Sequence, residues 1–265
     1  MLSEIFRKLD EQGYVVVEKA LEGDLFAQAR DAFYRVEQQT HDDWARGFSY
    51  GNYGAGPDAH VVYPIIGWDE VFLDLLELPL AIDIVRRVLG PDMMMIDNAL
   101  HVKPAGTKAH TGWHRDTGIW EHDIAKWDES DRASWRQMGA VDRPHHKIKV
   151  FFLVEDVGLD TGPFSVVPGS HKLTDQLPPT FENLEDMPGH VRVTGPAGAA
   201  IIWNGCIWHT AMDNMDVRER RMLCYNYTHF GDLQHKECVV EGEFRRRMTN
   251  ERSSFCKQLL GIERT

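Results

Sequence analysis

The sequence lacks the cysteine pairs and long apolar runs that indicate several large classes of protein. Its four cysteines are scattered along 265 residues without a Cys-x-x-Cys pair, which argues against a zinc ribbon or a thioredoxin-type centre. No apolar run approaches the ~20 residues that cross a bilayer, and the opening MLSEIFRKLDEQGY lacks the apolar centre of a signal peptide. We therefore expect a cytoplasmic protein with reduced thiols and no membrane partner.

Positive charge is also in the minority. Lys and Arg number 29 against 41 Asp and Glu, which gives a net charge of −12 at pH 7. A surface of this sign repels phosphate backbones, so we expect no nucleic-acid partner. The hydrophobic fraction of 43% is sufficient for a large core without disulfides. These quantities favour an ordinary globular protein, and they leave the oligomeric state open.

Three common catalytic motifs are absent. There is no His-Glu-x-x-His for a zincin protease and no Gly-x-Ser-x-Gly for a nucleophile-elbow hydrolase. No Gly-x-Gly-x-x-Gly follows a strand, so a dinucleotide site has no support. The thirteen histidines must therefore be judged by their spacing.

The first third of the chain reads mainly as helix. Apolar residues at helical spacing predict helices over 3–10, 22–39 and 78–90, and the β-branched run 14–18 predicts a strand. The stretch 41–64 is rich in Gly, Tyr, Asn and His and is typical of a long loop.

The pattern then changes to short strands separated by turns that contain Gly and Pro. No helix alternates with these strands, which argues against a doubly wound parallel sheet and favours a jelly roll or barrel. We expect one domain over 1–265, with a helical part to about 90, a cupin-like double-stranded β-helix core over 92–230 and a last helix near 240–261. The predicted strands are 92–104, 146–157, 164–168, 190–193, 199–205, 206–211 and 220–230.

The segment WHRD (113–116) has the spacing of a metal site. In an extended strand, His114 and Asp116 project from the same face, so one imidazole and one carboxylate can reach one ion. A second imidazole from elsewhere completes the two-His, one-carboxylate facial triad. Alone, His-x-Asp is weak, because it occurs by chance in many proteins.

His209 is the candidate for the third ligand. It ends a strongly apolar run, IIWNGCIWHT, where a polar ring requires a reason, although a core histidine bonded to backbone is the alternative. Arg220 follows eleven residues later, across a polar turn, so an antiparallel return places it beside His209 but deeper in the barrel. A guanidinium there suits the far carboxylate of a dicarboxylate, and Arg218 competes for the role because one residue of slack shifts the register.

With these residues in place, the sequence resembles the phytanoyl-CoA dioxygenase family of iron(II)/2-oxoglutarate oxygenases over nearly its whole length. The resemblance implies that His114, Asp116 and His209 bind Fe(II), that Arg220 holds 2-oxoglutarate, and that O2 is consumed. The matching segments are DEQGYVVVEKAL (10–21), LHVKPAG (100–106), WHRD (113–116), TGPFSVVPGSHK (161–172) and the series His209, Asn214, Arg220.

The resemblance also makes finer assignments. Asn98 matches roughly where the family has a second contact to 2-oxoglutarate, and His171 is expected to stabilise a turn. Ala211 departs from the family, which often has a hydroxylated residue two positions after the distal histidine, and Thr210 is the candidate to compensate. Because related halogenases have Gly or Ala in place of Asp116, the resemblance implies hydroxylation or a related oxidation.

The function expected is therefore oxidation of a C–H bond in a small metabolite, with release of succinate and CO2. Two alternatives remain: a metal-containing jelly-roll protein that binds a ligand without oxidising it, and a purely structural barrel. The long segment 117–145 predicts a lid. Its three tryptophans, together with Trp113, either line a substrate pocket or pack in the core.

Overall fold

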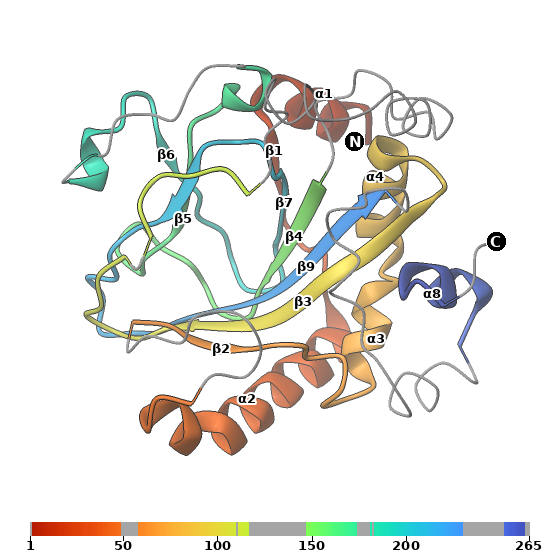
Figure 1. Cartoon of the computed structure of the whole chain (residues 1–265), viewed down its shortest axis with the longest axis horizontal. Helices are drawn as coiled ribbons and strands as arrows, with labels where there is room; N and C mark the ends of the chain where they lie inside the picture. Colours follow the sequence, from red (N-terminus) through yellow and green to blue (C-terminus); the bar gives the residue numbers. More distant parts are fainter. Residues whose placement is uncertain are drawn as a thin grey trace, which may run out of the picture.

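Two antiparallel sheets form the centre of the computed structural model, which describes residues 2–48, 58–109, 111–116, 147–173, 181, 183–229 and 252–262 (Figure 1). The larger sheet has the order β1 (Tyr14–Val17), β7 (Ala200–Asn204), β4 (Lys147–Leu153), β9 (Arg220–His229), β3 (Met93–Lys103) and β2 (His60–Val62). The smaller sheet has the order β6 (Val191–Arg192), β5 (Phe164–Val166) and β8 (His209–Ala211). The predicted jelly-roll core is confirmed.

Alternation along the strands gives the larger sheet two different faces. On β9, Leu223, Tyr225 and Tyr227 belong to one buried cluster, whereas Met222 and Cys224 belong to another. The first cluster packs against helices, and the second faces the smaller sheet, because successive side chains of a strand point to opposite sides. We call the second face the inner face; it carries the candidate site.

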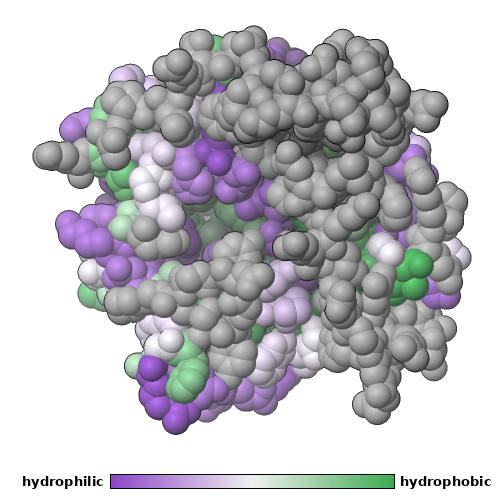
Figure 2. All heavy atoms as spheres, in the orientation of Figure 1, coloured by the Kyte–Doolittle hydropathy of each residue, from purple (hydrophilic) through white to green (hydrophobic). Residues whose placement is uncertain are grey.

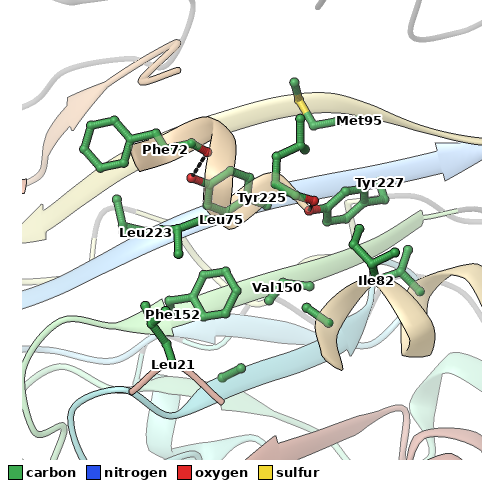
Figure 3. Packing of buried hydrophobic residues seen from close by; sticks show 14 of the residues in the cluster. Leu21, Phe72, Leu75, Ile82, Met95, Val150, Phe152, Leu223, Tyr225 and Tyr227 are labelled. Carbon is green, nitrogen blue, oxygen red and sulfur yellow. Dashed lines mark hydrogen bonds between the residues drawn. The ribbon is translucent and has the colours of Figure 1, made fainter. Parts of the chain in front are cut away.

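Helices cover the outer face (Figure 1). They are α1 (Leu2–Gln12), α2 (Gly23–Ala45), α3 (Val71–Leu76), α4 (Pro79–Leu89) and α8 (Ser254–Leu259). Two tyrosines of β9 fix α3 on the sheet: Tyr225 donates a hydrogen bond to the carbonyl of Phe72 at 2.7 Å, and Tyr227 donates to that of Leu76 at 3.2 Å (Figure 3). Each bond satisfies a hydroxyl that would be costly to bury alone.

Aromatic rings join the two sheets on the inner face. The ring centroid of Phe164, on β5, lies 4.7 Å from that of Trp203 on β7 and 5.2 Å from that of Phe151 on β4. His209 packs against two of these rings, with centroids 5.5 Å from Phe164 and 4.5 Å from Trp203. The apolar contacts between the sheets therefore also restrain the His209 imidazole.

The N-terminal third differs from the sequence prediction in three places. Helix α2 continues to Ala45, beyond the predicted end at 39. The predicted loop 41–64 contains β2, whose three residues are all buried and pair with β3. Helix α3 was not predicted, because six residues buried almost all round show no helical periodicity. The predicted lid 117–145 and most of the predicted last helix lie outside the described residues.

None of the described helices is long and apolar enough to span a bilayer. On the face drawn in Figure 2, the coloured residues show apolar side chains in small, separate areas among hydrophilic ones.

Candidate metal centre

A pair of backbone hydrogen bonds places two histidines side by side. The amide of His114 donates to the carbonyl of His209 at 3.0 Å, and the amide of His209 donates back at 2.9 Å. Residues that exchange both bonds in an antiparallel bridge project their side chains from the same face. The two rings accordingly lie with centroids 4.2 Å apart.

Asp116 joins this pair from two residues further along the same extended segment. Its amide donates to the carbonyl of Gly205 at 3.0 Å, which holds the segment against the larger sheet. The intervening Arg115 points the other way, where its guanidinium lies over the Trp208 ring and donates to the carbonyl of Ser170. The predicted alternation of WHRD is therefore confirmed.

The donor atoms of the three side chains converge. The Oδ1 of Asp116 lies 3.7 Å from the Nε2 of His114 and 3.7 Å from the Nε2 of His209. Two atoms each about 2.1 Å from one ion are at most about 4.2 Å apart, so both distances fit a shared ion. All three ligand atoms lie within 4.8 Å of one another.

Both rings have their other nitrogen bonded to backbone. The Nδ1 of His114 lies 2.8 Å from the carbonyl of Gly112, and the Nδ1 of His209 lies 3.0 Å from that of Ile207. Because a carbonyl only accepts, each Nδ1 carries the proton and each Nε2 presents a lone pair. Burial lowers the pKa of His209 to about 4, although Asp116 opposes that shift, so the neutral ring is the stable form. This donor set suits a divalent transition metal such as iron(II).

Lys149 holds the carboxylate oxygen that faces away from the histidines. Its Nζ lies 2.5 Å from the Oδ2 of Asp116, and both side chains are mostly buried. Burial alone would raise the pKa of Asp116, but the Lys149 ammonium and His209 hold it well below its usual range. The ammonium also lies 5.2 Å from the centre of the Trp203 ring, which packs on His209. The ion pair therefore leaves Oδ1 as the oxygen available to a metal.

We expect Lys149→Met to weaken both the fold and metal binding. Removing one partner of a buried ion pair costs about 3–5 kcal/mol, and losing an outer partner of a metal ligand costs about 10–100-fold in affinity. Urea unfolding of the apoprotein and nickel titration measure the two effects. The exposed Lys172→Met is the matched control and should change neither. Unaltered nickel affinity in Lys149→Met would contradict this role.

Arg220 lies on the inner face at the beginning of β9. It is 6% exposed, its Nη1 donates to the carbonyl of Gly162 at 2.6 Å, and its Nε has no hydrogen-bond partner among the described residues. In the β3–β9 register it pairs with Lys103, a second buried cation. Burial lowers the pKa of Arg220 to about 10 and that of Lys103 to about 8. Within the described part of the chain, no carboxylate forms an ion pair with either cation.

The register of β5 relates the position of Arg220 to that of His209. On β5, Val166 pairs with His209 and Phe164 pairs with Ala211, whereas the guanidinium reaches Gly162, two residues further on. Two residues of a strand span about 6.6 Å. The arginine therefore lies beyond Ala211 when viewed from the histidine.

Arg218, the competing arginine, lies in solvent. Its side chain is 60% exposed and pairs with Asp216 at 2.7 Å. The turn before Arg220 is fixed by buried Asn214, whose Nδ2 lies within 3.2 Å of the carbonyls of Lys103, Pro104 and Arg218. These bonds set the register in which residue 220, not 218, points inward.

Two predicted contacts to 2-oxoglutarate are not supported by their positions. Asn98 lies on the outer face, on the side of the sheet opposite the His–Asp–His cluster, where its Oδ1 accepts from the amides of Ile65 at 2.8 Å and Ile66 at 3.0 Å. The Thr210 hydroxyl donates to the carbonyl of Thr111, and alternation puts it on the face of β8 opposite His209.

Sequence reasoning missed Lys149, although a signal existed. Lys147 and Lys149 occupy one face of an otherwise apolar strand, KIKVFFL, where a charge requires a partner.

The indole of Trp113 donates to the carbonyl of Leu184 at 2.9 Å, and the other three tryptophans considered lie outside the described residues. His171 bonds to the carbonyl of Asp10 at 3.0 Å, as a structural residue would.

Solved structures with this fold include two with a metal and the keto acid bound. HygX from Streptomyces hygroscopicus, described with nickel, 2-oxoglutarate and hygromycin B, matches with a TM-score of 0.63 and 16% identity over 85% of this chain and 86% of its own. The epimerase SnoN, described with Fe3+, alpha ketoglutarate and nogalamycin RO, matches with a TM-score of 0.61 and 18% identity over 86% and 83%. At these identities the likeness establishes the fold alone.

Sequence comparison gives the family. The L-proline trans-4-hydroxylase of Streptomyces griseoviridis is 25% identical over 186 residues, which are 60% of this chain and 63% of that enzyme, so the chain spans under two thirds of this relative's length. The sequence pattern described as phytanoyl-CoA dioxygenase matches residues 9–222, from the end of α1 into β9. With most of its length matched and the His–Asp–His cluster assembled inside the jelly roll, the chain belongs to the phytanoyl-CoA dioxygenase family.

Proposed function

We propose that this protein is an iron(II)- and 2-oxoglutarate-dependent dioxygenase that hydroxylates a C–H bond of a small-molecule metabolite. The observation that carries the proposal is the convergence of His114, Asp116 and His209 with Arg220 buried beyond them. In the balanced reaction, one atom of O2 enters the substrate as a hydroxyl and the other enters succinate, while 2-oxoglutarate loses CO2. When bound, the iron and the keto acid supply this oxidising chemistry.

The chain's own side chains supply position and charge. The two Nε2 atoms and the Asp116 Oδ1 hold the metal, and Lys149 restrains the second carboxylate oxygen. Arg220 binds the far carboxylate of 2-oxoglutarate, with Lys103 as a neighbouring positive charge. Ala211, on the His209 face of β8, leaves room between them but donates no hydrogen bond.

Hydroxylation is favoured over halogenation because a carboxylate occupies the third ligand position. Asp116 is held by both a backbone bond and an ion pair, which leaves no ligand position on the protein side for a halide. The names of the relatives support a small-molecule substrate: a proline hydroxylase by sequence, and solved structures with hygromycin B or nogalamycin RO bound by fold. Two buried free thiols, Cys224 and Cys256, suit a reducing cytoplasm.

The test is a coupled assay for succinate with iron(II), 2-oxoglutarate and air. We expect succinate to form in proportion to a product heavier by one oxygen atom, and labelled O2 to place its label in that product. A halogenated product in the presence of chloride would exclude the hydroxylase assignment. Metal and ligand binding without any turnover across a broad substrate panel would favour the alternative, a jelly-roll protein that binds its ligand without oxidising it.

A further inference from the structure

A second buried cation, Lys103, lies directly beside Arg220. The two residues are partners in the β3–β9 register, so both side chains project from the inner face. Like charges placed opposite each other on a sheet destabilise it, and burial of a charge without an opposite partner adds to that cost. Lys103 is only 2% exposed, so water does not screen the pair. An anion that binds both cations would account for their position.

One residue, Gly162, contacts both cations. Its carbonyl accepts a hydrogen bond from the Arg220 Nη1 at 2.6 Å. A Cβ atom added to Gly162 would lie 2.7 Å from the Cδ and 2.8 Å from the Cε of Lys103, so the lysine chain crosses directly over this glycine. The φ of +65° at residue 162 also favours glycine. The close approach at Gly162 therefore brings the lysine chain and the guanidinium to the same point of the inner face.

The Lys103 ammonium has hydrogen-bonding capacity that the protein does not use. Its Nζ donates to the carbonyl of Lys108 at 2.6 Å, its one hydrogen bond in the described part of the chain. Asp213 and Asp58 act on its charge only from a distance, and Asp213 pairs with the Lys108 ammonium instead. Because an ammonium has three N–H donors, two remain for a ligand.

We propose that Lys103 is a second co-substrate-binding residue, whose ammonium joins the Arg220 guanidinium on the far carboxylate of 2-oxoglutarate. This inference rests on the proposed function and adds a determinant of co-substrate affinity and of its pH dependence. The two oxygens of a carboxylate have enough lone pairs to accept two bonds from arginine and another from lysine. Ala211 donates no hydrogen bond from the β8 side, so the ammonium supplies a contact that this side lacks.

Proton uptake should accompany binding in this arrangement. Burial and the adjacent Arg220 charge lower the pKa of Lys103 to about 8, and Asp213 and Asp58 oppose that shift only in part. A bound carboxylate favours the charged ammonium and raises the pKa again. Near pH 8 the ammonium is therefore charged in about half of the free protein and in most of the complex. Affinity should fall as pH rises above about 8, because the neutral amine must first take up a proton.

Calorimetry of nickel-loaded protein with 2-oxoglutarate tests the inference without turnover. Titrations at pH 8 in two buffers of different ionisation enthalpy count the protons, and we expect wild type to take up about half a proton for each 2-oxoglutarate bound. The wild-type affinity should fall at least ~5-fold between pH 7 and pH 9.5. 2-Oxopentanoate, which lacks the far carboxylate, should bind without this proton uptake.

Two variants assign the proton to Lys103. Lys103→Met removes the ammonium and keeps an apolar chain, so it should lower 2-oxoglutarate affinity at least ~10-fold at pH 7 and abolish the proton uptake, with nickel affinity unchanged. Lys103→Arg stays charged at every pH tested, so its affinity should not fall up to pH 9.5. Lys108→Met, in the same loop with a side chain 85% exposed, is the matched control and should behave as wild type.

The outcomes separate this inference from a structural role and from the proposed function. A lysine that only anchors the loop through Lys108 would take up no proton when 2-oxoglutarate binds. Absence of uptake in wild type, or wild-type affinity in a folded Lys103→Met, would overturn the inference alone. The wild-type proton count decides even if Lys103→Met fails to fold. Failure of nickel or 2-oxoglutarate to bind wild-type protein would overturn the proposed function, and this inference with it.

Discussion

His114→Ala is expected to lower nickel affinity more than 100-fold and to abolish succinate formation, while the apoprotein remains folded. Loss of an outer partner already costs about 10–100-fold, so loss of a ligand costs more. The fold should tolerate the change because the His114 side chain is 38% exposed and the Asp116–Lys149 pair stays intact. Nickel titration, the succinate assay and urea unfolding provide the three measurements.

The same experiment at Asp116 should give a different result. Asp116→Ala removes a ligand but also leaves the Lys149 ammonium buried without its partner, so we expect the apoprotein to lose about 3 kcal/mol of unfolding free energy in addition. His41→Ala, on the exposed side of α2, is the control and should alter neither property. Wild-type nickel affinity in the His114 variant would refute the metal centre.

Arg220→Met is expected to weaken 2-oxoglutarate binding at least ~100-fold, with nickel affinity unchanged. A guanidinium makes two charge-assisted hydrogen bonds to a carboxylate, worth about 1.5–3 kcal/mol each, and in this buried position water does not replace them. Unfolding free energy of the apoprotein should not fall, because a buried cation without a carboxylate partner among the described residues is itself costly. Calorimetry with 2-oxoglutarate and urea unfolding test the two statements.

Arg218→Met is the matched control, two residues away. Its guanidinium is in solvent beside Asp216, so 2-oxoglutarate affinity should stay within about twofold of wild type. A large loss in Arg218→Met, with little loss in Arg220→Met, would mean that the far carboxylate binds at the turn. Partial recovery in Arg220→Lys would support a charge requirement.

The cluster of His114, Asp116 and His209 was predictable because its spacing is local or periodic. His114 and Asp116 are two residues apart in an extended segment, and His209 is an imidazole at the end of an apolar strand. The position of Arg220 was predicted from a strand, a turn and an antiparallel return strand. Which arginine points inward, Arg220 or Arg218, depends on the three backbone carbonyls that the Asn214 side chain binds, and no local sequence pattern shows these contacts. The register was set by a tertiary contact.

The outer-face residues were harder to assign. Asn98 directly follows the inner-face residue Asp97, and the irregularity between Met95 and Asp97 shifts the alternation of β3, so a match to an approximate position does not determine the face. Helix α3 lacks periodicity because the sheet and α2 bury it from several sides. Asp97, Asn226 and Lys149 are aligned on three strands that meet only in the folded sheet, so no local sequence pattern connects them.

The hydrogen bonds from His114 and His209 to the carbonyls of Gly112 and Ile207 affect how a metal ion would bind. Because they orient both imidazoles as the chain folds, the rings have few rotamers left to lose when an ion arrives, a saving of about 0.5–1.5 kcal/mol for each side chain. Because the ligand side chains are already oriented, the rate of metal binding should be limited by loss of water from the ion and not by rearrangement of the protein.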